Sequence, residues 1–176
     1  MASQQHVVRV GVAAIISDAE GKMVVGVRKG SHGAGTLQFP GGHLEVGERS
    51  FDCAVRETLE ETGLEVIAKK TVTFTEDYFD AENKHYITIF VSCKRRDEQE
   101  QPVIMEPKKC ESWTWRSEAE LREIMATEDG KKRLFLPIVN LFEHDRRFKE
   151  HGSLTDFLRE SDCSASPSET EICSSL

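Results

Sequence analysis

Residues Gly42–Leu64 read GHLEVGERSFDCAVRETLEETGL, and this stretch decides how the rest of the chain is interpreted. Ser50 is suited to cap a helix, and Gly63 is suited to end one, so the pattern predicts a helix from Ser50 to about Thr62. Apolar or small side chains recur on one side of it at helical spacing: Phe51, Ala54, Val55, Thr58 and Leu59. The helix is therefore expected to pack on a core through that side.

Glu57, Glu60 and Glu61 follow the spacing i, i+3 and i+4, which predicts three carboxylates on the helix face opposite the apolar one. A charged face usually means only solvent exposure. However, like charges at this spacing destabilise a helix by roughly a few tenths of a kcal/mol, and Arg56 is the one cation among them. Clustered hard oxygen atoms are what Mg²⁺ binds, with water and phosphate completing its shell. The tight turn at Pro40-Gly41-Gly42 just before the helix strengthens this interpretation.

The same stretch resembles the Nudix box, G-x5-E-x7-R-E-U-x-E-E-x-G-U, in which U is a bulky aliphatic residue. The residues at the required offsets are Gly42, Glu48, Arg56, Glu57, Thr58, Glu60, Glu61, Gly63 and Leu64. Only Thr58 departs from the pattern, and as a β-branched residue it keeps the shape of an aliphatic one. The resemblance implies a Nudix fold of the α/β (α+β-like) class, with a mixed β-sheet sandwiched between helices, and a hydrolase that cleaves a diphosphate linkage.

The resemblance also implies roles for individual residues. Glu57, Glu60 and Glu61 are expected to be the catalytic, metal-binding carboxylates, and the carbonyl of Gly41 a further ligand. The implied cofactor is Mg²⁺, for which Mn²⁺ can substitute. Behind these ligands, a charged hydrogen bond between Glu48 and Arg56 is expected to brace the loop onto the helix. The general base stays open: it is one of these glutamates, or Glu106 or Glu111 from a loop.

Segments outside the box are similar to the eukaryotic MutT-like nucleotide triphosphate diphosphatases. They are Arg28–Ser31, Gly33–Gly35, Gln38, Gly41–Glu45, His85–Ile89, Glu106–Trp115 and Leu134–Pro137. This similarity implies hydrolysis of a purine nucleoside triphosphate, including oxidised or modified guanine nucleotides, to a monophosphate and pyrophosphate, in nucleotide-pool sanitation. The substrate-binding residues it implies are Arg28, Gln38, His43, Thr88, Phe135 and Leu136.

Some of these residues can also be explained without a role in substrate binding. Arg28 fits a phosphate contact and a solvated cation at a strand end equally well. Thr88 and Phe135 also fit plain core packing, and Pro137 has no N–H with which to recognise a base. The apolar pair Phe135-Leu136 would suit a prenyl chain. Alternative functions are therefore hydrolysis of an isoprenoid diphosphate or a nucleotide sugar, or a non-catalytic nucleotide sensor, although a sensor has no need of the full carboxylate set.

Further elements follow from strand and helix patterns along the chain. Val7–Ser17 and Met23–Arg28 are expected to pair as a hairpin, and Lys29–Thr36 to form a glycine-rich loop. The other predicted strands are Val72–Tyr78, Tyr86–Cys93 and Ser112–Trp115, and the other predicted helices are Ser117–Met125 and Arg133–Phe142. Residues 1–6 are expected to be flexible, 7–150 to form the domain, and 151–176, which ends in the serine-rich Ser161–Leu176, to be a disordered tail.

Composition limits the partners. With 31 acidic and 23 basic side chains, the formal net charge of −8 disfavours binding to a nucleic acid duplex, which requires a basic face. A small phosphorylated substrate remains compatible, because a metal ion supplies positive charge locally. No segment has the length of apolar sequence that a membrane span needs. The five cysteines lack metal-ligand spacing and suggest reduced thiols in a cytoplasmic protein, with the nucleus also open and a homodimer compatible with the sequence.

Overall fold

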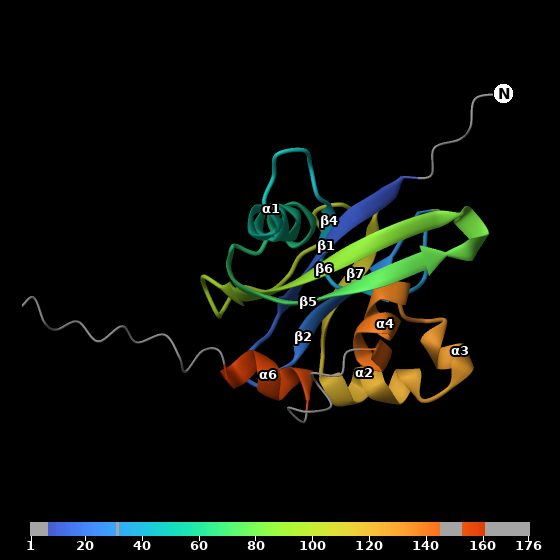
Figure 1. The fold of residues 1–176 in the computed structure, drawn as a ribbon. Coiled ribbons are helices and arrows are strands. Elements are labelled where there is room, and N and C mark those ends of the chain that lie inside the picture. The colour runs from blue at the N-terminus through green and yellow to red at the C-terminus, as the bar shows by residue number, and fades with distance from the viewer. Residues whose placement is uncertain (1–6, 31, 145–152, 161–176) are drawn as a thin grey trace, which may run out of the picture.

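The computed structural model of the protein describes residues 7–30, 32–144 and 153–160, and its strands form two sheets (Figure 1). The four-stranded sheet has the order β4-β1-β6-β5, with β1 at Val8–Ile16, β4 at Gly41–His43, β5 at Val66–Phe79 and β6 at Lys84–Arg95. The three-stranded sheet has the order β3-β2-β7, with β2 at Met23–Arg28, β3 at Leu37–Gln38 and β7 at Cys110–Arg116. The larger sheet is mixed, because β1 runs parallel to β6 and antiparallel to β4.

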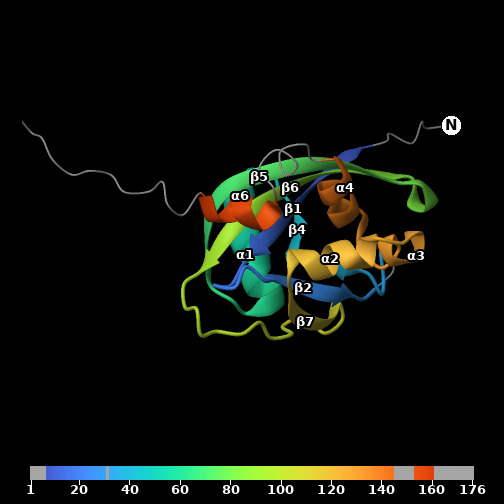
Figure 2. The ribbon, with the colours of Figure 1, turned by 90° about the horizontal axis from the view of Figure 1, so that it is seen from below.

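Helices cover both faces of the four-stranded sheet, as Figures 1 and 2 show. On one face lies α1 (Ser50–Thr62); on the other lie α2 (Glu118–Met125), α3 (Glu128–Lys131), α4 (Leu136–His144) and α6 (Leu154–Glu160). Because side chains of a strand alternate between faces, β1 supplies Ile15 to the core beneath α4 and Ala14 and Ile16 to the core beneath α1. The expected α/β (α+β-like) class with a mixed sheet between helices is confirmed.

The expected hairpin of the first two strands is wrong. A turn does form at Asp18, whose side chain accepts a hydrogen bond from the Lys22 backbone N–H at 2.7 Å. Beyond an isolated bridge between Ser17 and Met23, however, β1 pairs with β4 and β6, and β2 pairs with β3 and β7. The end of β1 and most of β2 are buried on both faces, so their partners are chosen by long-range packing and not by the turn that connects them.

The two middle strands form the long antiparallel pair that the sequence predicts around a polar turn. β5 and β6 extend beyond their predicted bounds and are joined by the short 3₁₀ helix Asp80–Glu82 and Asn83, which has a φ of 49°. Register shifts interrupt the pairing between Ala68 and Lys70 and between Thr71 and Thr73. The end of this β5–β6 hairpin carries inward-facing side chains to the cavity described below.

Local signals predicted two helix boundaries closely. α1 ends at Gly63, whose φ is 72° and whose N–H donates to the carbonyl of Leu59. Its start differs by one residue, because Arg49 is the N-cap and Ser50 the first helical residue, without a side-chain capping bond. Ser117 caps α2 through a reciprocal capping box with Glu120.

The helix predicted from Arg133 begins three residues later, at Leu136. The intervening backbone pairs with β3 instead: the Leu37 N–H donates to the Arg133 carbonyl at 2.8 Å, and the Phe135 N–H donates to the Leu37 carbonyl at 2.9 Å. Leu134 also forms a parallel bridge with Leu37, so this segment follows β3 as extended chain before the helix begins. This pairing fixes Phe135 beside the three-stranded sheet.

The expected domain boundary at residue 150 is also wrong, because α6 belongs to the core. Leu154 is 0 % exposed, and both Leu154 and Leu158 pack in the cluster that contains Ile138 and Phe142. The expected flexible N-terminus, residues 1–6, and the serine-rich Ser161–Leu176 lie outside the described residues. None of the helices in the described ranges has the length and apolar character needed to cross a membrane.

Replacement of Leu154 by Ala tests the place of α6 in the domain. Because this side chain is fully buried, we expect the substitution to lower the free energy of unfolding by about 2–5 kcal/mol, as measured by urea denaturation. The matched control is Leu59→Ala, since Leu59 is 47 % exposed and its truncation leaves no cavity. Equal stability of the Leu154→Ala variant and the wild type would show that α6 is not part of the cooperative fold.

Candidate active site

A cavity of about 360 Å³ opens between the two sheets, and most of the residues expected at the site line it. Its walls come from β1 to β6, α1 and the start of α4, so residues distant in sequence meet there. Of the expected site residues, it is lined by Arg28, Gln38, Gly41, His43, Glu57, Glu61, Thr88 and Phe135. A cavity of this size is suited to a small molecule.

Two carboxylates of α1 are buried against the glycines of β4. Glu57 is 8 % exposed and Glu61 4 % exposed. The Gly41 N–H donates to Glu61 Oε2 at 3.0 Å, and Glu57 lies so close to residue 42 that a Cβ there would collide with its carboxylate. The pair of glycines after Pro40 is therefore what allows the strand to approach the two carboxylates.

The prediction of one acidic face opposite an apolar face is only partly right. Glu60 is exposed and does not line the cavity, and Leu59, expected in the core, is also exposed. The helix turns Glu57 and Glu61 toward the sheet on the same side as the buried Thr58. Helical periodicity correctly placed Glu57 and Glu61 on one side of α1, but it wrongly placed Thr58 on the opposite side and could not show that the buried face includes charged groups.

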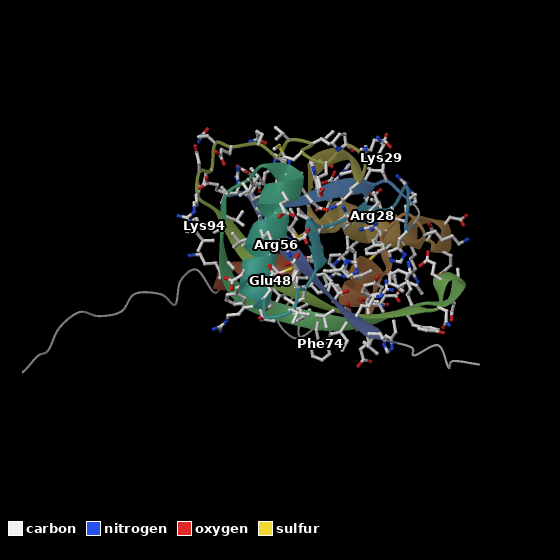
Figure 3. All side chains as sticks on the ribbon, turned by 90° about the horizontal axis from the view of Figure 1, so that it is seen from above. Arg28, Lys29, Glu48, Arg56, Phe74 and Lys94 are labelled. Carbon is white, nitrogen blue, oxygen red and sulfur yellow. The ribbon has the colours of Figure 1, made fainter. Side chains whose placement is uncertain are left out.

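Arg56 connects the loop before α1 to the helix (Figure 3). Its guanidinium donates two hydrogen bonds to Glu48, at 2.8 and 3.0 Å, as the resemblance implied, and a third to Glu57 Oε1 at 2.7 Å. A weaker contact of 3.4 Å reaches Glu60. The bonds from Arg56 and the Glu45 N–H lower the pKa of Glu48 to about 2. Arg56 thus orients Glu57 and is itself held by Glu48.

Burial raises the pKa of the Glu61 carboxyl to about 7, and the nearby charges of Glu57 and Glu106 act in the same direction. The Gly41 N–H opposes this shift. A pair of buried carboxylates with too little positive charge around it favours a cation with hard oxygen preferences, such as Mg²⁺. Within the described residues, no three His, Cys, Asp or Glu side chains are already grouped as a metal site, so the fit rests on Glu57, Glu61 and the adjacent Gly41 backbone.

Of the two candidate bases from loops, Glu106 is the one near the acidic pair. It pairs with Lys109 at 2.8 Å, and its charge contributes to the raised pKa of Glu61. Glu111 is exposed on β7 and does not line the cavity. Leu136 does not line it either, because α4 begins there and turns Pro137 and Ile138 toward the cavity instead.

Arg28 is a constrained, half-buried cation in the wall of the cavity and not a solvated strand end. Its Nη1 donates a short hydrogen bond to Gln38 Oε1, its Nε donates to the His32 carbonyl at 3.0 Å, and its guanidinium lies 4.1 Å from the centre of the Phe135 ring. Burial lowers the pKa of Arg28, while the charge of Glu61 opposes that shift. Arg28 is positioned to hold an anionic ligand.

Sequence reasoning missed an aromatic group in the cavity. His32 lies edge-on to Phe79 and Phe135, with ring centres 4.4 and 5.3 Å away, and Phe79 and Tyr86 are 5.7 Å apart. His32 Nδ1 also lies 2.6 Å from Glu82 Oε2. Tyr86 was within reach, because it lies two residues from Thr88 on the same face of β6. Nothing in the sequence indicates that His32, which lies in a glycine-rich loop, turns inward. Lys29 and Lys109 also line the cavity and were not predicted as site residues.

Comparison with known proteins identifies this arrangement. Residues 7–136 match the NUDIX domain family. The protein belongs to the Nudix family. It is therefore a pyrophosphohydrolase acting on nucleoside diphosphate-linked substrates, and Nudix hydrolases generally use divalent metal ions.

Solved structures with the same fold are distant in sequence. A NUDIX hydrolase from Nitrosomonas europaea is 20% identical with a TM-score of 0.64, covering 93% of this chain and 100% of that one. A MutT NUDIX hydrolase from Burkholderia pseudomallei is 22% identical with a TM-score of 0.56, covering 66% and 86%. A UDP-X diphosphatase is 20% identical with a TM-score of 0.58, covering 86% and 68%. At these identities the likeness shows the fold alone.

Replacement of Glu48 by Gln tests the brace between loop and helix. The folded-state pKa of Glu48, about 2, lies below the ordinary value of 4.5, so its charge stabilises the fold above pH 4.5, and this contribution is lost as the pH falls toward 2. We expect Glu48→Gln to lower the melting temperature at pH 7 and the difference from wild type to shrink between pH 4.5 and 2.

The matched control is Glu65→Gln, which removes an exposed ion pair with Arg96 at 3.7 Å and should change the melting temperature little, because solvent screens that pair. If the melting temperature of Glu48→Gln differs from that of the wild type by the same amount at pH 7 and pH 2.5, the charge of Glu48 does not contribute to stability.

Proposed function

We propose that the protein hydrolyses a purine nucleoside triphosphate, including oxidised or modified guanine nucleotides, to the monophosphate and pyrophosphate. The observation that supports this is one cavity that joins the buried pair Glu57 and Glu61 to a compartment of aromatic and hydrogen-bonding side chains. The acidic region suits a metal–polyphosphate group and the other compartment suits a flat base. The cofactor in this proposal is Mg²⁺, with Mn²⁺ able to substitute.

Different residues would bind the cation, orient its carboxylate ligands and bind the phosphates. Glu57 and Glu61 would hold the cation, with Arg56 fixing the direction of Glu57 through its 2.7 Å hydrogen bond. When bound, a divalent cation neutralises phosphate oxygens and makes water a better nucleophile near neutral pH. Arg28 and Lys109 line the same cavity and would bind the remaining phosphate charge.

A second candidate rests on the apolar part of the cavity. Phe39, Phe79, Phe135 and Ile138 contribute to its lining, which would accept a prenyl chain as well as a base. The fold is also that of a UDP-X diphosphatase, so a nucleotide sugar remains a further candidate substrate. A non-catalytic sensor is disfavoured, because binding alone does not require two buried carboxylates that need a cation.

Replacement of Glu61 by Gln tests the chemistry. The side chain keeps its shape but loses the charge that a cation needs, so we expect turnover with Mg²⁺ to fall by ~100-fold or more, since even residues behind a metal ligand typically contribute 10–100-fold. The melting temperature should not fall, because a neutral amide is easier to bury than a carboxylate.

Activity is measured as release of pyrophosphate from a panel of nucleotides, with chelator abolishing it and Mg²⁺ restoring it. Glu65→Gln, an exposed glutamate outside the cavity, is the matched control and should match the wild type. Turnover of the Glu61→Gln variant at the wild-type rate would remove Glu61 from the metal site.

Replacement of Phe135 by Ala separates the two candidate substrates. For purine triphosphates we expect the loss of aromatic contact, worth ~1–3 kcal/mol, to raise KM more than it changes kcat, because contact with the base is felt equally in the ground and transition states. Phe74→Ala is the matched control, since Phe74 is exposed on the outer side of the sheet (Figure 3). Unchanged purine kinetics together with crippled hydrolysis of a prenyl diphosphate would replace the nucleotide proposal by the second candidate.

A further inference from the structure

We propose that Asp77 is a positioning residue that fixes the Thr88 hydroxyl as a hydrogen-bond acceptor toward the cavity, so that the enzyme selects purine bases with an N–H donor at that point. This inference rests on the proposed nucleotide substrate and goes beyond it. Asp77 lies on β5, is 0 % exposed and was not singled out by any sequence motif. Its effect on the ligand would pass through Thr88, which lines the cavity.

The contacts of Asp77 are unusual for a buried acid, because they come from neutral groups on three elements. Oδ2 accepts hydrogen bonds from Thr88 Oγ1 at 2.6 Å and from Thr75 Oγ1 at 3.0 Å. Oδ1 accepts one from Asn140 Nδ2 at 2.8 Å, and Asn140 Nδ2 also reaches the Glu76 carbonyl at 3.2 Å. These bonds keep the buried carboxylate satisfied.

This pattern determines where the hydroxyl proton of Thr88 points. A carboxylate accepts hydrogen bonds and donates none, so Thr88 must use its single O–H to donate to Asp77. For any other partner, Thr88 Oγ1 has only its lone pairs available. Thr88 can then accept a hydrogen bond from a ligand but cannot donate one, and a ligand acceptor at this point would face another acceptor.

Gly11 keeps that oxygen open to the cavity. Gly11 is the register partner of Thr88 in the parallel pairing of β1 and β6, and both residues line the cavity. A Cβ added at residue 11 would lie 3.8 Å from Thr88 Oγ1, an ordinary contact that causes no clash but would place a methyl group beside the hydroxyl. The absence of a side chain at this position therefore leaves more room beside the Thr88 hydroxyl on the cavity side.

Other groups in the wall leave Thr88 a distinct role. Pro137 lines the cavity from α4 but has no N–H. Gln38 turns its Oε1 to Arg28, and because arginine only donates, this bond fixes the orientation of the amide and leaves its N–H₂ to donate to a ligand. Gln38 therefore supplies donors and Thr88 an acceptor. A purine edge that carries both an acceptor and an N–H, as in guanine, hypoxanthine or adenine, is complementary to this pair.

A purely structural role for Asp77 is the competing explanation, since Asn140 ties α4 to β5 through it. The two explanations differ in what they predict for selectivity. If Asp77 only links α4 to β5, its replacement changes the stability of the fold and affects the hydrolysis of all substrates alike. A positioning role changes the preference between two bases that differ in an N–H donor, and it does so mainly in KM.

The test compares GTP, ITP and ATP with purine riboside triphosphate, whose base has no N–H donor on its six-membered ring. For the wild type, we expect kcat/KM for the best of the three donor-bearing nucleotides to exceed that of purine riboside triphosphate at least ~10-fold, the scale of one hydrogen bond that cannot be replaced. Asp77→Asn places an amide donor where the carboxylate accepted and frees the Thr88 hydroxyl to reverse. In this variant, kcat/KM for the donor-bearing nucleotide should come within about twofold of kcat/KM for purine riboside triphosphate. The change should come chiefly from a higher KM for the donor-bearing nucleotide.

Thr75→Val is the matched control. It removes a hydrogen bond to the same oxygen of Asp77, but Thr75 does not line the cavity, so the wild-type ratio should persist even if the melting temperature falls. Gly11→Ala leaves the Asp77 bonds in place and should lower the ratio by covering Thr88. If Asp77→Asn fails to fold, Thr88→Val should lose the ratio and Thr88→Ser should keep it.

The outcomes separate this inference from the proposed function. A wild-type enzyme that hydrolyses none of the four nucleotides, and no oxidised or modified guanine nucleotide either, overturns the proposed function and this inference with it. An enzyme that hydrolyses them with a ratio unchanged by Asp77→Asn and Gly11→Ala, or by Thr88→Val where Asp77→Asn does not fold, overturns this inference alone and leaves Asp77 a structural residue.

Discussion

Glu57 and Glu61 lie buried against a strand of glycines, and the surrounding structure compensates for placing two acids there. Burying a carboxylate is costly unless hydrogen bonds or opposite charge offset it. The Gly41 N–H and Arg56 supply part of that offset, and Glu48 in turn holds Arg56 in place. The remaining imbalance shows in the raised pKa of Glu61, and it is the physical basis for the attraction of a cation to this point. A less polar pair of residues would pack more easily, but it would leave the cavity without that attraction.

The cavity itself follows from the divergence of β1 and β2. Because these strands enter different sheets after the Ser17–Met23 bridge, the two sheets separate and leave space between them. The β5–β6 hairpin then supplies one wall, and the backbone pairing of Phe135 with Leu37 supplies another. The same divergence explains why the active residues come from so many elements: each sheet presents one face to the space, and α1 closes one side of it.

What the sequence predicted well is local. α1 and its end at Gly63 depend on periodicity and one left-handed glycine, so the local sequence was enough to place them. The Glu48–Arg56 brace was implied by the resemblance to the Nudix box, and the structure contains it. What it missed depends on contacts between distant segments. The separation of β1 from β2, the inward turn of His32 and the core position of Leu154 are set by packing partners far along the chain. The exposure of Leu59 is an intermediate case, since periodicity fixed its direction relative to Glu57 but not which side the sheet would cover.

The two parts of the cavity use different physics, and this explains how an acidic chain can bind a polyphosphate. The formal net charge is −8, yet Arg28, Lys29 and Lys109 all line the cavity, so the field there is set locally and not by the total. Charge of this kind attracts any phosphate and discriminates poorly, and salt weakens it where it is exposed. Discrimination between bases requires groups of fixed polarity that solvent cannot replace. The buried hydrogen bonds around Asp77 and the Arg28–Gln38 contact provide that polarity, because each partner can satisfy its neighbour in only one orientation. Attraction rests mainly on the cations and selection mainly on the buried polar groups, and Arg28 takes part in both, because it lines the cavity and also fixes the orientation of Gln38.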